Sequence, residues 1–391
     1  MVTLATAVTC VALIAGTRDF MPFSGALLAM ALLAEVAACS DRQRLMRSVP
    51  AFAADMALSL LLLAIVSPQG IGEGIHAASP ASVIILCLGL LAIYGGSIGF
   101  RAFLQLHRLS VFETVQACLA FSIGAGAVLL LRGGAASVCL GALFLLLSVV
   151  CYWGALSRFA SEPYTRDRRI SASWAAALLI AGSFLVFSRS AAIVFVCVAA
   201  ACASYLYSRT GKFSLGLHAS LFLGAALVVS PLPGYVVRAL ALAVPGAPGW
   251  LVWTIAAAAA VCYGVGATRV EEKRGLRVLW VVPALILGFT AAAIATTLIA
   301  SLGGQIASTP SALSVIRTAV NCILAVVLVF LCLRQRRIEL GWVAYMAVGF
   351  GTLKLLFEDL RFGNALSLVV SLLFYGSVLI LLPRLTRRVE A

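Results

Sequence analysis

The chain has 391 residues, of which 63% are hydrophobic and only 11% are charged, and its mean hydropathy is +1.11. Soluble domains are about 45–50% apolar and about 25% charged, so this chain cannot cover its own surface with polar groups and is expected in a lipid bilayer. The net charge of +14 leaves three classes of explanation open: nucleic acid, an anionic substrate, or orientation in the membrane.

Long apolar segments follow one another along the whole chain, separated by charges and by Pro/Gly clusters. Because a bilayer core takes about 20 mostly apolar residues per helix, we expect an all-α, polytopic bundle of about fourteen transmembrane helices. The expected ranges are 2–16, 21–39, 51–67, 80–100, 110–131, 134–157, 171–187, 190–207, 213–231, 250–267, 278–301, 310–333, 340–357 and 364–383. The connections are short, which predicts one transmembrane domain over 1–391 and no soluble domain.

The first segment is short for a span, but it lacks the positive n-region and the small-residue cleavage site of a signal peptide. We therefore expect it to be the first transmembrane helix rather than a cleaved leader.

Basic residues gather in every second connection, as expected of cytoplasmic loops. These connections and the C-terminal tail hold 21 of the 28 Lys and Arg residues. The alternation predicts that both termini are cytoplasmic, and it attributes most of the +14 to orientation rather than to nucleic-acid binding. Arg outnumbers Lys by 25 to 3 in an Ala- and Gly-rich chain, which indicates a GC-rich bacterial genome and hence a bacterial plasma membrane.

The basic connections recur at similar intervals, which favours repeated two-helix hairpins, although any compact helical membrane protein has periodic loops. Small residues such as Gly95-Gly96 and Gly124-Ala125-Gly126 are interpreted as surfaces where helices approach closely. Proline and glycine bound a short apolar segment within 231–248. It is too short to span, and a helix on the outer surface is favoured over a pore-lining re-entrant segment.

The eleven cysteines lie in or beside apolar segments, without a CxxC pattern or a nearby histidine at metal-ligand spacing. Nucleotide-binding and hydrolase motifs such as GxxxxGK[ST], HExxH and GxSxG are absent. We expect no disulfide framework, no metal and no cofactor.

Ionisable residues at membrane depth are costly, so each is a candidate for function. A first group lies near the predicted cytoplasmic ends of spans. It comprises Glu35, Asp55, Glu113, His107 and His218. Either these residues relay protons, or they snorkel and pair with the arginines of the loops.

A second group lies near the predicted outer ends of the twelfth and thirteenth spans. It comprises Arg317, Asn321, Lys354, Glu358, Asp359 and Arg361. Two interpretations compete: salt bridges that join the two helices, or a ligand site. Since Arg binds phosphate in a bidentate manner and Lys acts as a point charge, the ligand would be an anionic head group such as a lipid phosphate.

The same stretch carries a family resemblance. The sequence from Lys354 to Asp359-Leu360, followed by Ser371 and Gly376, resembles the K-x-x-x-x-D-L … S-x-x-x-x-G ending of bacterial polytopic membrane-protein families of unknown function. The resemblance implies a fold of many hairpin-like spans and no particular reaction. In those families an arginine is expected shortly before the serine, where this chain has Leu368.

The favoured function is a transporter or flippase-like carrier of a small or lipid-linked molecule, with membrane lipids as partners. One alternative is a structural or assembly subunit of a membrane complex, which would bind protein partners. Another is a membrane-embedded transferase or polymerase acting on lipid-linked glycans, which is disfavoured because the outer loops are short.

Overall fold

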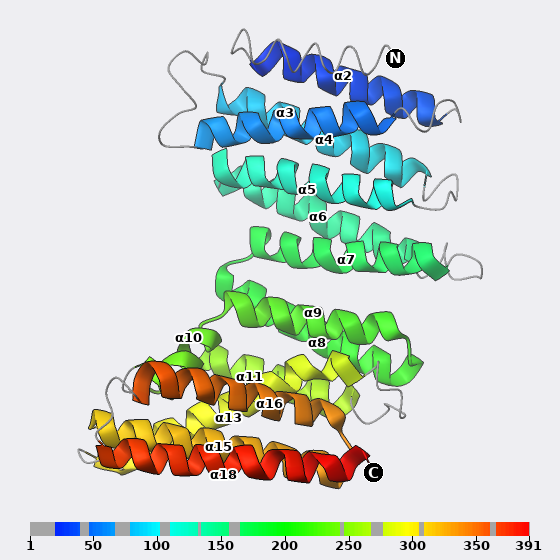
Figure 1. Cartoon of the computed structure of the whole chain (residues 1–391). Coiled ribbons are helices and arrows are strands. Elements are labelled where there is room, and N and C mark those ends of the chain that lie inside the picture. Colours follow the sequence, from blue (N-terminus) through cyan, green and yellow to red (C-terminus); the bar gives the residue numbers. More distant parts are fainter. Residues whose placement is uncertain are drawn as a thin grey trace. The chain divides into compact units, whose positions relative to one another are not determined.

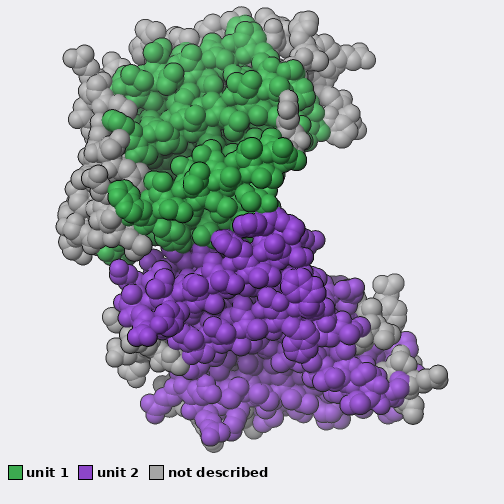
Figure 2. All heavy atoms as spheres, turned by 180° about the vertical axis from the view of Figure 1, so that it is seen from behind, with its two compact units in different colours: residues 1–186 green, residues 187–391 purple. Residues whose placement is uncertain are grey.

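The computed structural model describes residues 20–39, 47–66, 79–101, 110–131, 134–155, 165–242, 246–266, 277–304, 309–359 and 365–390. These residues are 95% helical and contain no strand. The chain divides into two compact units, Met1–Val186 and Phe187–Ala391 (Figure 2). The sequence pattern does not indicate this division, and a single transmembrane domain over 1–391 stays a prediction.

Six described helices of unit 1 lie side by side (Figure 1). They are α2 (Phe20–Cys39), α3 (Ser48–Val66), α4 (Pro80–Gly99), α5 (Val111–Leu131), α6 (Gly134–Trp153) and α7 (Thr165–Val186). Helices α2 to α5 pack against one another, and α6 joins them to α7. Buried side chains such as Leu27, Leu58, Leu90 and Phe144 form one continuous apolar core.

In unit 2, α13 contacts α9, α11, α15 and α16, while α8 packs against α9 and α11 and α18 packs against α15. The elements of this unit are α8 (Arg189–Thr210), α9 (Phe213–Val229), α10 (Leu232–Val237), η4 (Arg238–Leu242), α11 (Trp250–Gly266), η6 (Val278–Trp280), α13 (Val281–Leu302), α15 (Pro310–Gln335), α16 (Ile338–Lys354), η7 (Leu355–Asp359) and α18 (Ala365–Glu390). Two of the short elements, η4 and η7, are π-helical turns.

The fold agrees with the expected polytopic all-α bundle. In the described part of the chain, ten helices are long and apolar enough to cross a membrane, or eleven if the bent pair α9 and α10 counts as one span. Helix α11 and the apolar part of α18 are shorter. Thirteen of the fourteen expected spans thus coincide with helices, and the remaining one, 2–16, lies outside the described residues.

The surface of these helices is apolar. Leu33, Ile85, Leu146 and Val228 are between 66% and 77% exposed, although each lies within a long helix. A helix satisfies all of its own backbone hydrogen bonds, which is why it can present such side chains to hydrocarbon. The protein is therefore an integral membrane protein.

Tight turns join several of the helices. Ser188 caps α8, and its side-chain oxygen accepts a hydrogen bond from the Ala191 amide at 3.4 Å. The same helix ends at Gly211, whose φ of +67° is a conformation that glycine adopts without a steric penalty. Arg336 takes a similar φ of +51° between α15 and α16, where a non-glycine residue is uncommon.

The short segment after α9 is a helix, as expected, and its position on the outer surface stays a prediction. Helix α10 and η4 turn away from α9 by 64° and pack against α13, and η4 also packs against α15. One face of the segment, with Leu232, Tyr235 and Leu240, is at most 6% exposed. The Tyr235 hydroxyl is 3.0 Å from the Thr297 hydroxyl of α13. The opposite face is exposed at Gly234, Val237 and Arg238, so the segment is half-buried against the neighbouring helices.

Candidate functional site

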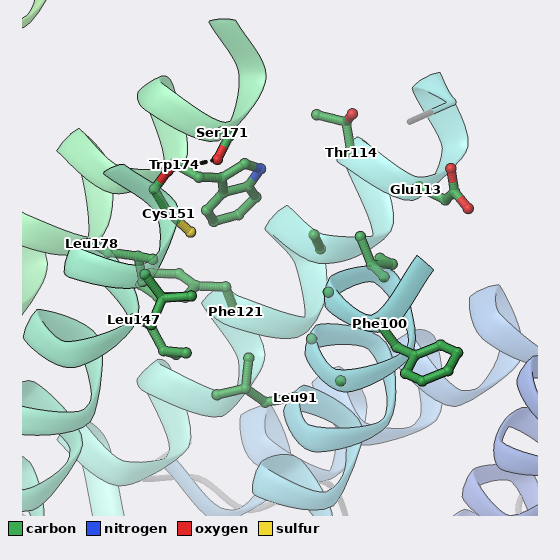
Figure 3. A pocket seen from close by; sticks show the side chains of 16 residues that line it. Leu91, Phe100, Glu113, Thr114, Phe121, Leu147, Cys151, Ser171, Trp174 and Leu178 are labelled. Atoms are coloured by element: carbon green, nitrogen blue, oxygen red, sulfur yellow. Dashed lines mark hydrogen bonds between the residues drawn. The ribbon is translucent and has the colours of Figure 1, made fainter. Parts of the chain in front are cut away.

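A pocket of about 310 Å³ lies between α4, α5, α6 and α7 of unit 1 (Figure 3). Its walls are almost entirely apolar, and they include Leu91, Phe121 and Leu147. Phe100 and Val150, which also line it, are each 47% exposed, so the pocket opens on the apolar surface of the unit. Ligand-binding pockets are commonly of this size and character, with a few polar groups.

The polar groups of the pocket lie at one end. Figure 3 shows Ser171, Thr114 and Glu113 at this end and Leu91 and Leu147 toward the other. Along α5, Glu113 precedes the pocket residue Phe121 by two helical turns, a rise of about 12 Å. The pocket is therefore amphipathic along the helix axes, and its polar end is the predicted cytoplasmic end.

Glycines of α4 form one wall of the pocket. A Cβ added at Gly95, Gly96 or Gly99 would meet no atom within 4 Å. The interpretation of Gly95-Gly96 as a helix-packing surface is therefore wrong, because these glycines border open space. It holds for Gly124, where a Cβ would lie 3.1 Å from the Leu91 Cβ.

Glu113 is held by the start of its own helix. Its Oε2 accepts hydrogen bonds from the Ser110 amide at 2.7 Å and the Ser110 hydroxyl at 3.0 Å, while the Glu113 amide donates to Ser110 Oγ at 3.2 Å. This reciprocal arrangement is a capping box, and it stabilises the beginning of α5. It also fixes the carboxylate at the polar end of the pocket.

Two arginines complete a buried ion-pair network around this carboxylate. Arg47 Nη1 lies 3.1 Å and Arg101 Nε 3.3 Å from Glu113 Oε1, and Arg101 Nη2 lies 2.8 Å from Glu35 Oε2. All four side chains are at most 11% exposed. Both oxygens of Glu113 are thus engaged by groups of the protein itself.

The structure separates the predicted inner group into three parts. Glu35 and Glu113 pair with arginines, as the pairing interpretation expects, whereas Asp55 accepts a hydrogen bond from Gln116 at 2.9 Å. His218 belongs to unit 2, where it is 1% exposed and its ring faces Phe222 at 6.3 Å. His107 lies outside the described residues.

The predicted outer group assembles in unit 2 around Arg317. Its Nη1 binds Glu358 Oε1, its Nε donates to the Ala239 carbonyl at 2.9 Å, and its Nη2 donates to the Arg238 carbonyl at 3.2 Å. The two carbonyls belong to η4, so Arg317 joins the bent segment to α15 and η7. The guanidinium is thereby surrounded by acceptors from the protein itself.

Lys354 and Asn321 are similarly occupied. Lys354 Nζ donates to the Ser314 carbonyl at 3.1 Å and the Thr318 hydroxyl at 2.8 Å, and it lies 3.6 Å from Glu358 Oε2. Asn321 Nδ2 donates to the Ala347 carbonyl at 2.9 Å. These contacts favour the interpretation that the group joins helices.

Two members of the outer group are less defined. Asp359 ends η7, and its side chain is not described, while Arg361 lies outside the described residues.

A further ion pair lies at the opposite end of unit 2, and sequence reasoning missed it. Arg277 Nη1 is 3.4 Å from Glu339 Oε2, and the Tyr263 hydroxyl donates to Glu339 Oε1 at 3.3 Å. Glu339 stands in the first turn of a span after a basic connection, as Glu113 does. That shared position is the signal by which it could have been found.

No family model matches the chain, and no curated protein or solved structure matches it either. The resemblance carried by Lys354, Asp359, Ser371 and Gly376 stays a prediction.

Proposed function

We propose that this integral membrane protein is a carrier of an amphipathic, lipid-linked molecule, whose apolar chain occupies the pocket between α4 and α7. The observation that carries the proposal is the glycine-walled pocket, apolar along its length and polar at one end. A lipid also has a long apolar part and one polar end. The opening beside Phe100 and Val150 lies on an apolar surface, from which a lipid would enter directly.

The polar end of the pocket suits an anionic head group. Arg101 Nη1 is buried and has no hydrogen-bond partner among the described residues, which leave one guanidinium donor beside Glu113 unused. Arg168 precedes the pocket residue Ser171 by three positions and lies on the same side of α7, one turn closer to the helix start. Arginine is well suited to phosphate oxygens, because its fork of donors matches their geometry.

The proposal is tested by filling the pocket without disturbing the fold. Gly96→Leu places a side chain in open space at the pocket, and Gly25→Leu is the matched control, because a Cβ at Gly25 of α2 also meets nothing within 4 Å. Both changes replace glycine with a better helix former. Each protein is purified from native membranes, and its bound lipids are identified by mass spectrometry.

We expect the wild type and Gly25→Leu to retain the same lipid-linked molecule and Gly96→Leu to lose it. Equal retention by the two variants would contradict binding in this pocket. The retained molecule is then reconstituted with the protein in vesicles, and a membrane-impermeant reagent measures its head group in the outer leaflet over time. Retention without transfer between leaflets would contradict the carrier function and favour a subunit that only binds lipid.

A further inference from the structure

Asp55 is a carboxylate buried inside unit 1. It is 5% exposed and lies seven residues after the start of α3, a rise of about 10 Å. Its Oδ1 accepts the hydrogen bond from Gln116, and its Oδ2 has no hydrogen-bond partner in the part of the chain that the structure describes. Among the described residues, neither Lys nor Arg forms an ion pair with it, in contrast to Glu35 and Glu113.

A second buried polar group belongs to the same core. The Tyr94 hydroxyl of α4 is fully buried and makes no hydrogen bond among the described residues. Tyr94 packs in the same apolar core as Ala54 and Leu58, which neighbour Asp55 along α3. Unpaired polar groups are rare in protein interiors, so the unpaired oxygen of Asp55 calls for an explanation.

The surrounding charges do not supply one. The titratable and polar groups that α2, α3, α4 and α5 bring to this region are Glu35, Arg47, Tyr94, Arg101, Glu113 and Gln116. The two arginines are matched by the two glutamates, so these described groups leave no positive charge for Asp55. Nor does any group of three His, Cys, Asp or Glu side chains suited to a metal ion occur in the described residues.

We propose that Asp55 is a proton-binding site, in which Oδ2 carries an exchangeable proton. Binding a proton removes a charge that would otherwise be buried without compensation, and it converts Oδ2 from an acceptor into a donor. Oδ1 meanwhile continues to accept the hydrogen bond from Gln116. The ligand of this site is thus a single proton, with no metal ion.

The site is connected to the pocket through α5. Gln116, which binds Asp55, and Glu113, which lines the pocket, are three residues apart on one face of this helix. Gain or loss of the proton therefore changes the charge one turn from the ion-pair network. This connection rests on the proposed function and gives the carrier a proton-dependent step, whereas the proton site itself does not depend on what the pocket binds.

The test is infrared spectroscopy of the purified full chain in lipid nanodiscs at neutral pH. A protonated carboxylic acid has a carbonyl band apart from those of carboxylates, and this band shifts in D₂O. We expect the band in the wild type and its loss in Asp55→Asn. That variant keeps the shape of the side chain and its acceptor for Gln116, so the fold is expected to survive.

Two further variants keep the result decisive. In Glu113→Gln the band is expected to remain, because Glu113 is ion-paired and is not its source. In Gln116→Leu it is expected to remain but to shift, since the Asp55 carbonyl loses its donor. A wild type without the band, or a band that persists in Asp55→Asn, would overturn the proton site. Since no lipid enters the measurement, failure of the carrier proposal would leave this result unchanged.

Discussion

Some of the buried charges in the described residues are held by several partners. Arg317 illustrates this at the scale of a single residue, because its guanidinium binds one carboxylate and two main-chain carbonyls. The carbonyls of Arg238 and Ala239 lie in a π-helical turn that follows α10. A guanidinium there stabilises carbonyls near the negative end of the segment. Removing one partner would leave the rest of the network buried and uncompensated.

Glu358→Gln tests this arrangement. Gln keeps the size of the side chain but leaves Arg317 and Lys354 without their carboxylate, so unfolding in detergent should become easier by about 3–5 kcal/mol. The control is Arg209→Gln, because Arg209 is exposed and its guanidinium donates to the Tyr205 hydroxyl, and surface contacts contribute about 0–1 kcal/mol. Denaturant titration followed by circular dichroism measures the free energy of unfolding of both variants. Equal losses of stability would show that the Arg317 network adds little.

The residue scale is also where sequence reasoning reached its limit. Buried acids are few in this chain, so Glu35, Asp55 and Glu113 could be selected from the sequence. Their separate roles could not be predicted, because ion pairing depends on which helix ends meet. Arg101, for example, pairs with Glu35, which lies far from it in the sequence. The sequence likewise left two interpretations of Arg317 and Lys354, a link between helices and a ligand site. The link is favoured only by contacts in the structure, where both side chains donate to main-chain carbonyls of η4 and α15.

At the scale of helices, glycine has two opposite uses in unit 1. On α4 it leaves space for the pocket, whereas between α6 and α7 it allows two backbones to meet. A Cβ at Gly182 would lie 2.8 Å from the Gly141 carbonyl oxygen, and one at Gly141 would lie 2.6 Å from the Leu185 Cβ. The Ser148 hydroxyl adds a hydrogen bond to the Ala175 carbonyl at 2.7 Å in the same contact. Small residues thus bring α6 and α7 together over several turns.

Gly182→Ala tests the close contact. The added methyl group meets a backbone oxygen that cannot rotate away, so the two helices must move apart, at a cost of about 1–3 kcal/mol. Gly25→Ala is the control, because its methyl group meets open space and alanine favours the helix by about 1 kcal/mol. Thermal unfolding in detergent compares them. A Gly182→Ala protein as stable as Gly25→Ala would contradict the contact.

Helix positions were accessible from the sequence, and the pocket was not. Each described span follows from a long apolar segment, since a bilayer demands that length and composition. A glycine that packs and a glycine that borders a pocket give the same sequence pattern, so Gly95-Gly96 could not be distinguished from Gly124. The bend after α9 was located by its prolines, but its burial depends on the faces of α13 and α15.

At the scale of the molecule, contacts between helix ends agree with the predicted alternation within each unit. In unit 1, Arg101 after α4 and Glu35 near the end of α2 meet Glu113 at the start of α5. In unit 2, Arg317 near the start of α15 meets Glu358 after α16. These contacts place the ends of α2 and α4 beside the start of α5, and the start of α15 beside the end of α16, as the distribution of Lys and Arg predicts. Which ends face the cytoplasm stays a prediction.

Reporter fusions decide this orientation. A reporter enzyme that is active only outside the cytoplasm is fused after Glu73, Glu162, Arg209 or Pro248, so that each unit supplies one position on either predicted side. We expect activity at Glu73 and Pro248 and none at Glu162 and Arg209, because the latter two lie in basic connections that resist translocation. Expression of each fusion, measured by immunoblot, is the control.

Activity at both Glu73 and Glu162 would mean that the number of spans between them is even, which would contradict the three expected at 80–100, 110–131 and 134–157. The reversed pattern at all four positions would keep the spans but place the basic connections, and with them the polar end of the pocket, outside the cytoplasm.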